Sequence, residues 1–295
     1  MSREQLDFIL KVSAENPPPP NAGPPQMREW FEAINAQTPI ADGAMIETIS
    51  VGPCPADLIR LPGSDKNRLV IYYHGGGFLF GSPRSHRTIA THLARTGGAT
   101  VLSVDYRLAP EHPAPTAHED AYAAYLWALD HGYAPASIVL SGDSAGGNLA
   151  LATAVRARDS GVPLPSSLVL MSPALDLASE GESHRSQADA PLVNRGLMDL
   201  FNAVYVGSGD LRSPQVTPFY GDVSGLPPVL VHVGSWELLR DDSVTLAERI
   251  NSSGGNAELK VWDGMCHSWQ LFAPMLEEGM ASIEEAGAFI RHHTA

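Results

Sequence analysis

A serine flanked by small residues is the first candidate for chemistry. The string Gly142-Asp143-Ser144-Ala145-Gly146 follows the apolar run at 137–142 and opens a segment with helical spacing at 146–159. A serine on such a sharp strand-to-helix turn presents its hydroxyl above the sheet, beside a helix N-terminus whose dipole favours a developing negative charge. The alternative is a glycine-rich turn with an incidental serine, which this context disfavours. Ser144 is therefore predicted to be a nucleophile.

A glycine-rich loop is the second candidate feature. His74-Gly75-Gly76-Gly77-Phe78 follows the apolar run LVIYY. Consecutive glycines leave backbone N–H groups uncovered, which a tetrahedral oxyanion needs. A phosphate cradle is the competing interpretation, but no lysine follows as in a phosphate loop and the dinucleotide spacing of glycines is absent. We assign the oxyanion donors to the N–H groups of Gly76, Gly77 and Ala145.

The base must be one of 11 histidines. His267 lies between the last apolar run, 258–262, and a C-terminal helical pattern, and it completes the chain order nucleophile, acid, histidine. His232 falls within an expected strand, where a buried structural role is favoured. Other histidines precede the nucleophile or lie in the C-terminal tail: His74, His86, His112, His118, His292 and His293. We predict His267 as the base.

The acid that orients this histidine should follow the apolar run 228–233. Glu237 stands just beyond the run, whereas Asp241 and Asp242 fall at a helix start, where acidic residues commonly act as caps. We predict Glu237 as the acid that holds the imidazole tautomer. Its extra methylene, compared with aspartate, demands a slightly different backbone distance.

The elements around these residues alternate between strand and helix. Six apolar runs indicate buried strands: 69–73, 99–104, 137–142, 167–172, 228–233 and 258–262. Segments with helical spacing separate most of these runs or follow the last one: 117–131, 146–159, 241–252 and 281–292. Strands apolar on both faces imply a parallel sheet covered by helices on both sides. The runs AMIETISV and DLIRL before it predict an antiparallel pair entering the sheet. The fold class is α/β.

The alternation breaks between Pro173 and Pro228, a stretch too long for an ordinary connection. It contains a helical pattern near 195–205 and predicts an inserted cap, with which the N-terminal helices pack. The expected organisation is a catalytic core at 43–173 and 216–295, N-terminal cap helices at 1–42 and an inserted cap segment at 174–215. Five apolar residues are candidates for lining the substrate site: Met27, Phe31, Leu197, Phe219 and Trp269.

Composition limits the partners and the compartment. The chain has 295 residues, and its 19 basic and 33 acidic residues give a net charge of −14, which disfavours nucleic acid and fits a neutral or apolar substrate. Two cysteines, Cys54 and Cys266, make no disulfide framework and favour a reducing compartment. No signal-peptide pattern and no apolar run near the roughly 20 residues needed to span a bilayer occurs. We expect a cytoplasmic protein without stable membrane insertion.

Three motifs together resemble the hormone-sensitive-lipase-like family of bacterial carboxylesterases and lipases. They are HGGGF at 74–78, DYRLAPE at 105–111 and GDSAGGNLA at 142–150. The resemblance implies the α/β-hydrolase fold, with a mostly parallel eight-stranded sheet flanked by helices and a helical cap. It also implies no cofactor and no metal, short- to medium-chain acyl ester substrates, and a possible homodimer. Arg107, Glu111 and Asp143 are expected to brace the loops around the site.

Glu237 departs from the resemblance, because the family usually has aspartate at that position. Two other functions remain open: an amidase or peptidase-like hydrolase on the same fold, and a non-catalytic relative that binds a small ligand. The presence of serine, histidine and an acid weighs against a pure binding role. Cys266, next to the predicted base, suggests the further hypothesis that the activity is sensitive to thiol reagents.

Overall fold

Eight strands form a single sheet in the computed structural model, which describes residues 3–20 and 22–294. The strands are β1 (Met45–Val51), β2 (Cys54–Arg60), β3 (Asp65–Tyr73), β4 (Ala99–Val104), β5 (Ile138–Asp143), β6 (Ser167–Met171), β7 (Val229–Gly234) and β8 (Ala257–Trp262). Their order is β1-β2-β4-β3-β5-β6-β7-β8. β2 pairs antiparallel with β1 and β4, and the remaining pairs are parallel. The predicted mostly parallel sheet with an antiparallel entry is confirmed.

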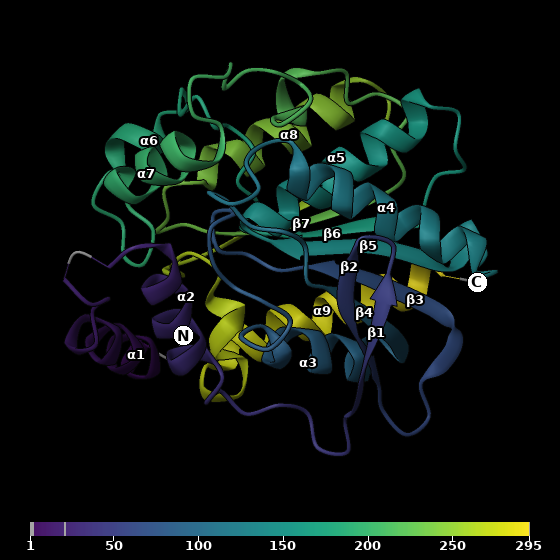
Figure 1. Cartoon of the computed structure of the whole chain (residues 1–295), viewed down its shortest axis with the longest axis horizontal. Coiled ribbons are helices and arrows are strands. Elements are labelled where there is room, and N and C mark those ends of the chain that lie inside the picture. Colours follow the sequence, from purple (N-terminus) through teal and green to yellow (C-terminus); the bar gives the residue numbers. More distant parts are fainter. Residues whose placement is uncertain (1–2, 21, 295) are drawn as a thin grey trace.

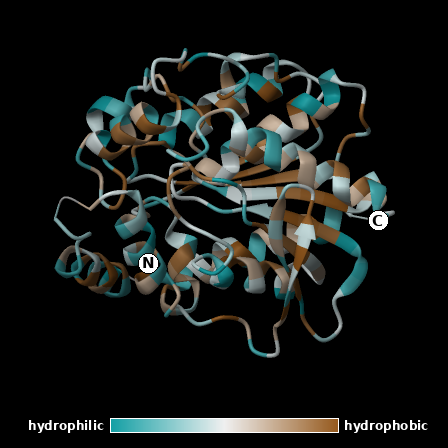
Figure 2. Cartoon of the chain, in the orientation of Figure 1, coloured by the Kyte–Doolittle hydropathy of each residue, from teal (hydrophilic) through white to brown (hydrophobic). Residues whose placement is uncertain are grey.

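Helices cover both faces of this sheet (Figure 1). α3 (Arg87–Gly97) and α9 (Glu277–His293) lie on one face, and α4 (Thr116–Asp130), α5 (Ala145–Asp159) and α8 (Arg240–Ser252) lie on the other. Successive residues of β3 enter different cores: Leu69, Ile71 and Tyr73 join one buried cluster, and Val70 and Tyr72 the other. This alternation explains why the central strands are largely apolar, as their hydrophobic colouring shows (Figure 2).

A group of helices lies together at one side of the molecule, away from the C-terminus (Figure 1). They are α1 (Arg3–Glu15), α2 (Pro24–Asn35), α6 (Ser183–Ser186) and α7 (Arg195–Tyr205). Short 3₁₀ turns complete the described elements: η1 (Pro135–Ser137), η2 (Pro218–Tyr220) and η3 (Trp269–Met275). The four helices, unlike these turns, come from the two segments in which the cap is expected, 1–42 and 174–215. None of the helices in the described ranges is both long and apolar enough to cross a membrane.

Arg28 attaches the N-terminal helix α2 to the core. Its Nε donates to the carbonyl oxygen of Leu79 at 2.9 Å, and its Nη2 donates to that of Ala109 at 2.8 Å. The guanidinium also forms two hydrogen bonds with the carboxylate of Glu111, at 2.6 and 3.0 Å. Because Leu79 follows the glycine loop, these bonds hold α2 next to that loop.

Candidate active site

Ser144 occupies a strained turn between β5 and α5. Its φ is 51° and its ψ is −120°, a conformation that costs energy for any residue except glycine. A side chain on Gly146 would place its Cβ 1.8 Å from the carbonyl oxygen of Tyr73, so only glycine fits there. Ser144 is 8% exposed, and it contacts the cavity described below. The turn therefore presents the hydroxyl at a defined place.

His267 and Glu237 form a buried pair. His267 Nδ1 lies 2.8 Å from Glu237 Oε2, and the Glu237 side chain is fully buried. The other carboxylate oxygen, Oε1, accepts from the Ser172 hydroxyl at 2.8 Å and from the Gly234 N–H at 2.5 Å. Oε2 can therefore accept a hydrogen bond from Nδ1–H, which places the lone pair of the neutral ring on Nε2, where it can act as a base.

The glycine loop approaches Ser144 from the end of β3. Gly76 and Gly77 have φ of 114° and 59°, and both contact the same cavity as Ser144. The N–H of Gly75 instead donates to Asp143 Oδ1 at 2.9 Å. Ala145 is the first residue of α5, where helix N–H groups have no acceptor within the helix. Gly76 and Gly77 thus line the same cavity as Ser144, and Ala145 follows Ser144 directly in the chain.

Asp143, next to Ser144, holds this loop in place. Its Oδ1 accepts from the Tyr72 hydroxyl at 2.6 Å as well as from Gly75. Its Oδ2 accepts from Ser268 Oγ at 3.3 Å and lies 3.7 Å from His86 Nε2. Burial raises the pKa of Asp143, but His86, Tyr72 and His267 together outweigh this effect and bring it to about 2. Asp143 is therefore an ionised carboxylate inside the site.

Arg107 and Glu111 make different contacts in the DYRLAPE segment. Arg107 forms a bidentate ion pair with the buried Asp120 of α4, with distances down to 2.6 Å. Glu111 instead accepts a hydrogen bond from the guanidinium of Arg28 in α2. Within the same segment the Tyr106 hydroxyl donates to the carbonyl oxygen of His74 at 2.7 Å, and the two rings stack at 4.2 Å. The segment thus supports both the glycine loop and the N-terminal helix.

A cavity of about 440 Å³ opens at Ser144 and His267. Met27, Phe31 and Leu197 line it, as proposed from the sequence. Phe219 and Trp269 are not among its lining residues. Phe219 contacts the Arg249 guanidinium, and Trp269 is fully buried in a cluster with Trp262 and Leu6. Their apolar character thus reflects core packing, since a buried aromatic side chain alone does not distinguish core from pocket wall.

Several lining residues were not identified from the sequence. Among them, His86 and Ser268 are polar. Most of the others are apolar side chains of the cap and of the segments beside the site, such as Leu10, Trp30, Ile34, Phe80, Phe201, Leu271 and Phe272. The helical spacing of Trp30 and Ile34 with Met27 and Phe31 could have indicated them, because residues three or four apart share one helix face. Ser268 carried no signal apart from its position after the predicted base.

The hypothesis that Cys266 confers sensitivity to thiol reagents is not supported by its surroundings. The side chain is fully buried in the cluster that contains Leu6, Trp262 and Met265. Burial, and to a lesser degree the charge of Glu237, raises the pKa of its thiol to about 12. Because the thiolate is the reactive form, this thiol is expected to be inert.

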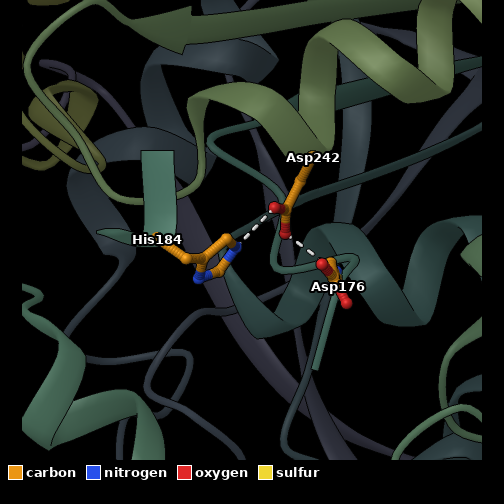
Figure 3. Close-up of side chains that lie close together, drawn as sticks. All are labelled: Asp176, His184 and Asp242. Carbon is orange, nitrogen blue, oxygen red and sulfur yellow. Dashed lines mark hydrogen bonds and ion pairs between the residues drawn. The ribbon is translucent and has the colours of Figure 1, made fainter. Parts of the chain in front are cut away.

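Three other titratable groups lie close enough to suggest a metal site: Asp176, His184 and Asp242 (Figure 3). His184 Nε2 lies 2.7 Å from Asp242 Oδ1, and Asp242 Oδ2 accepts from the backbone N–H groups of Leu175 and Asp176. Asp176 in turn accepts from the Tyr220 hydroxyl and from the N–H groups of Glu180 and Gly181. Donors directed at all four carboxylate oxygens do not suit a cation. The cluster therefore connects the segment after β6 to α8, where Asp242 had been interpreted as a helix cap.

Comparison with known proteins agrees with this geometry. The family described as the alpha/beta hydrolase fold matches residues 70–271. An acetyl-hydrolase of Streptomyces hygroscopicus is 41% identical over 249 residues, which cover 84% of this chain and 83% of that protein. An esterase of Acinetobacter venetianus is 33% identical over 285 residues, covering 96% and 94%.

Solved structures give the same result. The crystal structure of an esterase from the bacterial hormone-sensitive lipase family superposes with a TM-score of 0.96, at 41% identity and over 99% of both chains. A hormone-sensitive lipase from a metagenome library gives a TM-score of 0.95 at 36% identity, covering 100% of this chain and 99% of that one. The chain therefore belongs to the α/β-hydrolase fold family and, within it, to the hormone-sensitive-lipase-like family of bacterial carboxylesterases and lipases.

Proposed function

We propose that this protein is a carboxylesterase that hydrolyses short- to medium-chain acyl esters through Ser144, His267 and Glu237. The observation that carries the proposal is the buried hydrogen-bonded pair of His267 and Glu237 beside a cavity shared with a serine on a strained turn. Relatives named acetyl-hydrolase and esterase support the same reaction.

The reaction proceeds in two halves. The hydroxyl oxygen of Ser144 attacks the ester carbonyl carbon while its proton passes to His267 Nε2. The negative charge on the former carbonyl oxygen is stabilised by the N–H groups of Gly76, Gly77 and Ala145. His267 then gives the proton to the departing alcohol, and an acyl-enzyme remains. Water then attacks the acyl carbon while His267 takes its proton; the bond to Ser144 Oγ breaks, His267 returns the proton to that oxygen, and the acid is released.

The cavity supports the proposed substrate class. Its volume of about 440 Å³ lies in the lower part of the range of small-molecule sites, roughly 300–1,000 Å³. Met27, Phe31 and Leu197 supply apolar walls for an acyl or alcohol group. A formal charge of −14 also favours neutral esters over anionic ones.

The test is the hydrolysis of p-nitrophenyl esters from acetate to palmitate, beside Ser144→Ala and Glu237→Ala. We expect the highest kcat/KM at short to medium chains, and a loss of at least about a thousandfold without Ser144. A folded wild-type protein that hydrolyses no ester would refute the proposal. Turnover of matched p-nitroanilides above that of the esters would instead favour the amidase alternative.

A further inference from the structure

The hydroxyl of Ser268 lies between the predicted base and a second buried carboxylate. Its Oγ is 3.3 Å from His267 Nε2 and 3.3 Å from Asp143 Oδ2. Ser268 is 3% exposed, and its backbone N–H donates to Ser172 Oγ at 3.2 Å. Its φ of 47° lies in the left-handed region that disfavours most residues other than glycine. The hydroxyl is thus held in a defined position inside the cavity.

The hydrogen bonds that Ser268 can form differ between the two charge states of His267. Glu237 accepts a hydrogen bond from Nδ1–H, so Nε2 of the neutral ring is an acceptor. If the Ser268 hydroxyl donates to Asp143, its oxygen lone pair faces the lone pair of Nε2. Once Nε2 is protonated, it donates to Ser268 Oγ, and Ser268 donates to Asp143. With a neutral ring, the single hydroxyl proton of Ser268 can serve only one of two acceptors, Nε2 or Asp143 Oδ2, whereas with the imidazolium both hydrogen bonds form.

Several titratable groups lie around His267. Glu237 faces Nδ1 from the segment after β7, and Asp143 lies beyond Ser268 at the end of β5. The Cys266 thiol, next in the chain, stays protonated because burial raises its pKa to about 12. His86, before α3, contacts Asp143 on the other side, and burial lowers the pKa of the adjacent His74 to about 3. The two carboxylates therefore place negative charge on either side of the imidazole ring.

We propose that Ser268 is a positioning residue that, together with Asp143, stabilises the protonated form of His267 during ester hydrolysis. The proton that leaves Ser144 Oγ as the C–O bond forms is held on Nε2 toward Ser268 until the leaving alcohol takes it. The hydrogen bond from protonated Nε2 to Ser268 Oγ forms again when water attacks the acyl-enzyme. The consequence for the rate rests on the proposed function, whereas the effect on the titration of His267 does not.

The experiment measures this titration directly. In protein carrying ¹³C-labelled histidine, the ring resonance of His267, assigned by its loss in His267→Gln, is followed against pH for wild type, Ser268→Ala and Ser268→Gly. The glycine variant removes the hydroxyl while relaxing the left-handed backbone, so strain and hydrogen bonding are separated. Loss of one long charge-assisted hydrogen bond should lower the titration midpoint in both variants by about 0.5 to 1 pH unit.

A matched control removes a different hydroxyl from the same region. Ser235 Oγ accepts from the Gly264 N–H at 2.8 Å, in the loop that carries His267, but Ser235 does not line the cavity. Ser235→Ala should leave the midpoint of His267 unchanged. In parallel, the acid limb of kcat/KM for p-nitrophenyl butyrate should move to lower pH in both Ser268 variants, and kcat should fall about 3- to 10-fold.

The possible outcomes separate the two proposals. Midpoints indistinguishable from wild type in both Ser268 variants would overturn the role of Ser268, even if kcat falls, since a purely structural defect would lower kcat alone. If the midpoint of His267 falls in the Ser268 variants but the wild-type protein hydrolyses no ester, the proposed function is refuted and the stabilisation of the imidazolium by Ser268 stands. A lowered midpoint with a matching acid limb supports both.

Discussion

Glu237→Gln tests the assignment of the acid with little disturbance of the structure. Gln can keep the bonds that the Ser172 hydroxyl and the Gly234 N–H donate to Oε1. Its amide nitrogen then faces His267 Nδ1 at the position where a carboxylate oxygen lay at 2.8 Å. An amide N–H is a donor, so Nδ1 must become the acceptor and the ring proton moves to Nε2.

The expected loss follows from this tautomer. A ring protonated on Nε2 cannot take the proton of Ser144, and the analogous change in serine proteases lowers kcat by roughly 10⁴-fold. This corresponds to about 5.4 kcal/mol of transition-state stabilisation. The assay is kcat for p-nitrophenyl butyrate, with circular dichroism and the melting temperature to confirm that the variant is folded.

Asp241→Asn is the matched control, because Asp241 is the nearby acidic residue at the start of α8. Its carboxylate accepts from the Ser183 N–H at 2.8 Å and pairs with Arg240, away from His267. We expect its kcat to stay within about threefold of wild type. A folded Glu237→Gln variant that retains more than about a tenth of wild-type kcat would refute the reasoning on the acid.

Three further predictions follow from other contacts. Burial lowers the pKa of His118 from 6.5 to about 4, so between these values the unfolded chain binds more protons and stability falls as the pH drops. His118 alone should lower the free energy of unfolding by about 3 kcal/mol as the pH falls from 6.5 to 4. His118→Gln should therefore flatten the dependence of the urea-unfolding free energy on pH in this range, and an unchanged slope would contradict this. Iodoacetamide at pH 8 should leave esterase activity intact because the Cys266 thiol is buried, and inhibition that Cys266→Ala abolishes would disprove it. Arg28→Met removes four hydrogen bonds between α2 and the core and should lower the unfolding free energy by about 1–3 kcal/mol and raise KM, whereas an unchanged melting temperature would show that α2 is held by other contacts.

The sheet could be predicted from the sequence because its central strands are buried on both faces. Apolar runs such as 99–104 coincide with β4, and the alternation with helical patterns is enough to indicate a parallel sheet. Helix α3 was not predicted. Its buried face carries Thr88, Thr91 and His92 beside apolar residues, so the apolar periodicity is weak although the helix is largely buried.

The candidate site could be predicted only as far as its motifs reach. The strand-to-helix turn of Ser144 and the glycine loop have local signatures, and Glu237 and His267 follow from chain order. The cavity wall has no such signature, because it forms where α2, α7 and the loop after His267 meet in space. Phe201 illustrates this: its ring lies 2.4 Å from the position that a Cβ on Gly77 would occupy, a contact between residues far apart in the chain.

The glutamate in place of the expected aspartate can be understood from its surroundings. A Cβ on Gly234 would lie 2.1 Å from the carbonyl oxygen of Met265, so the end of β7 approaches the loop that carries His267 very closely. Ser172, at the end of β6, donates to Glu237 and accepts from the N–H of Ser268. A single hydroxyl thus connects Glu237 to the residue after His267. The longer side chain can reach His267 and still have its second oxygen held, because the neighbouring strand provides the donor.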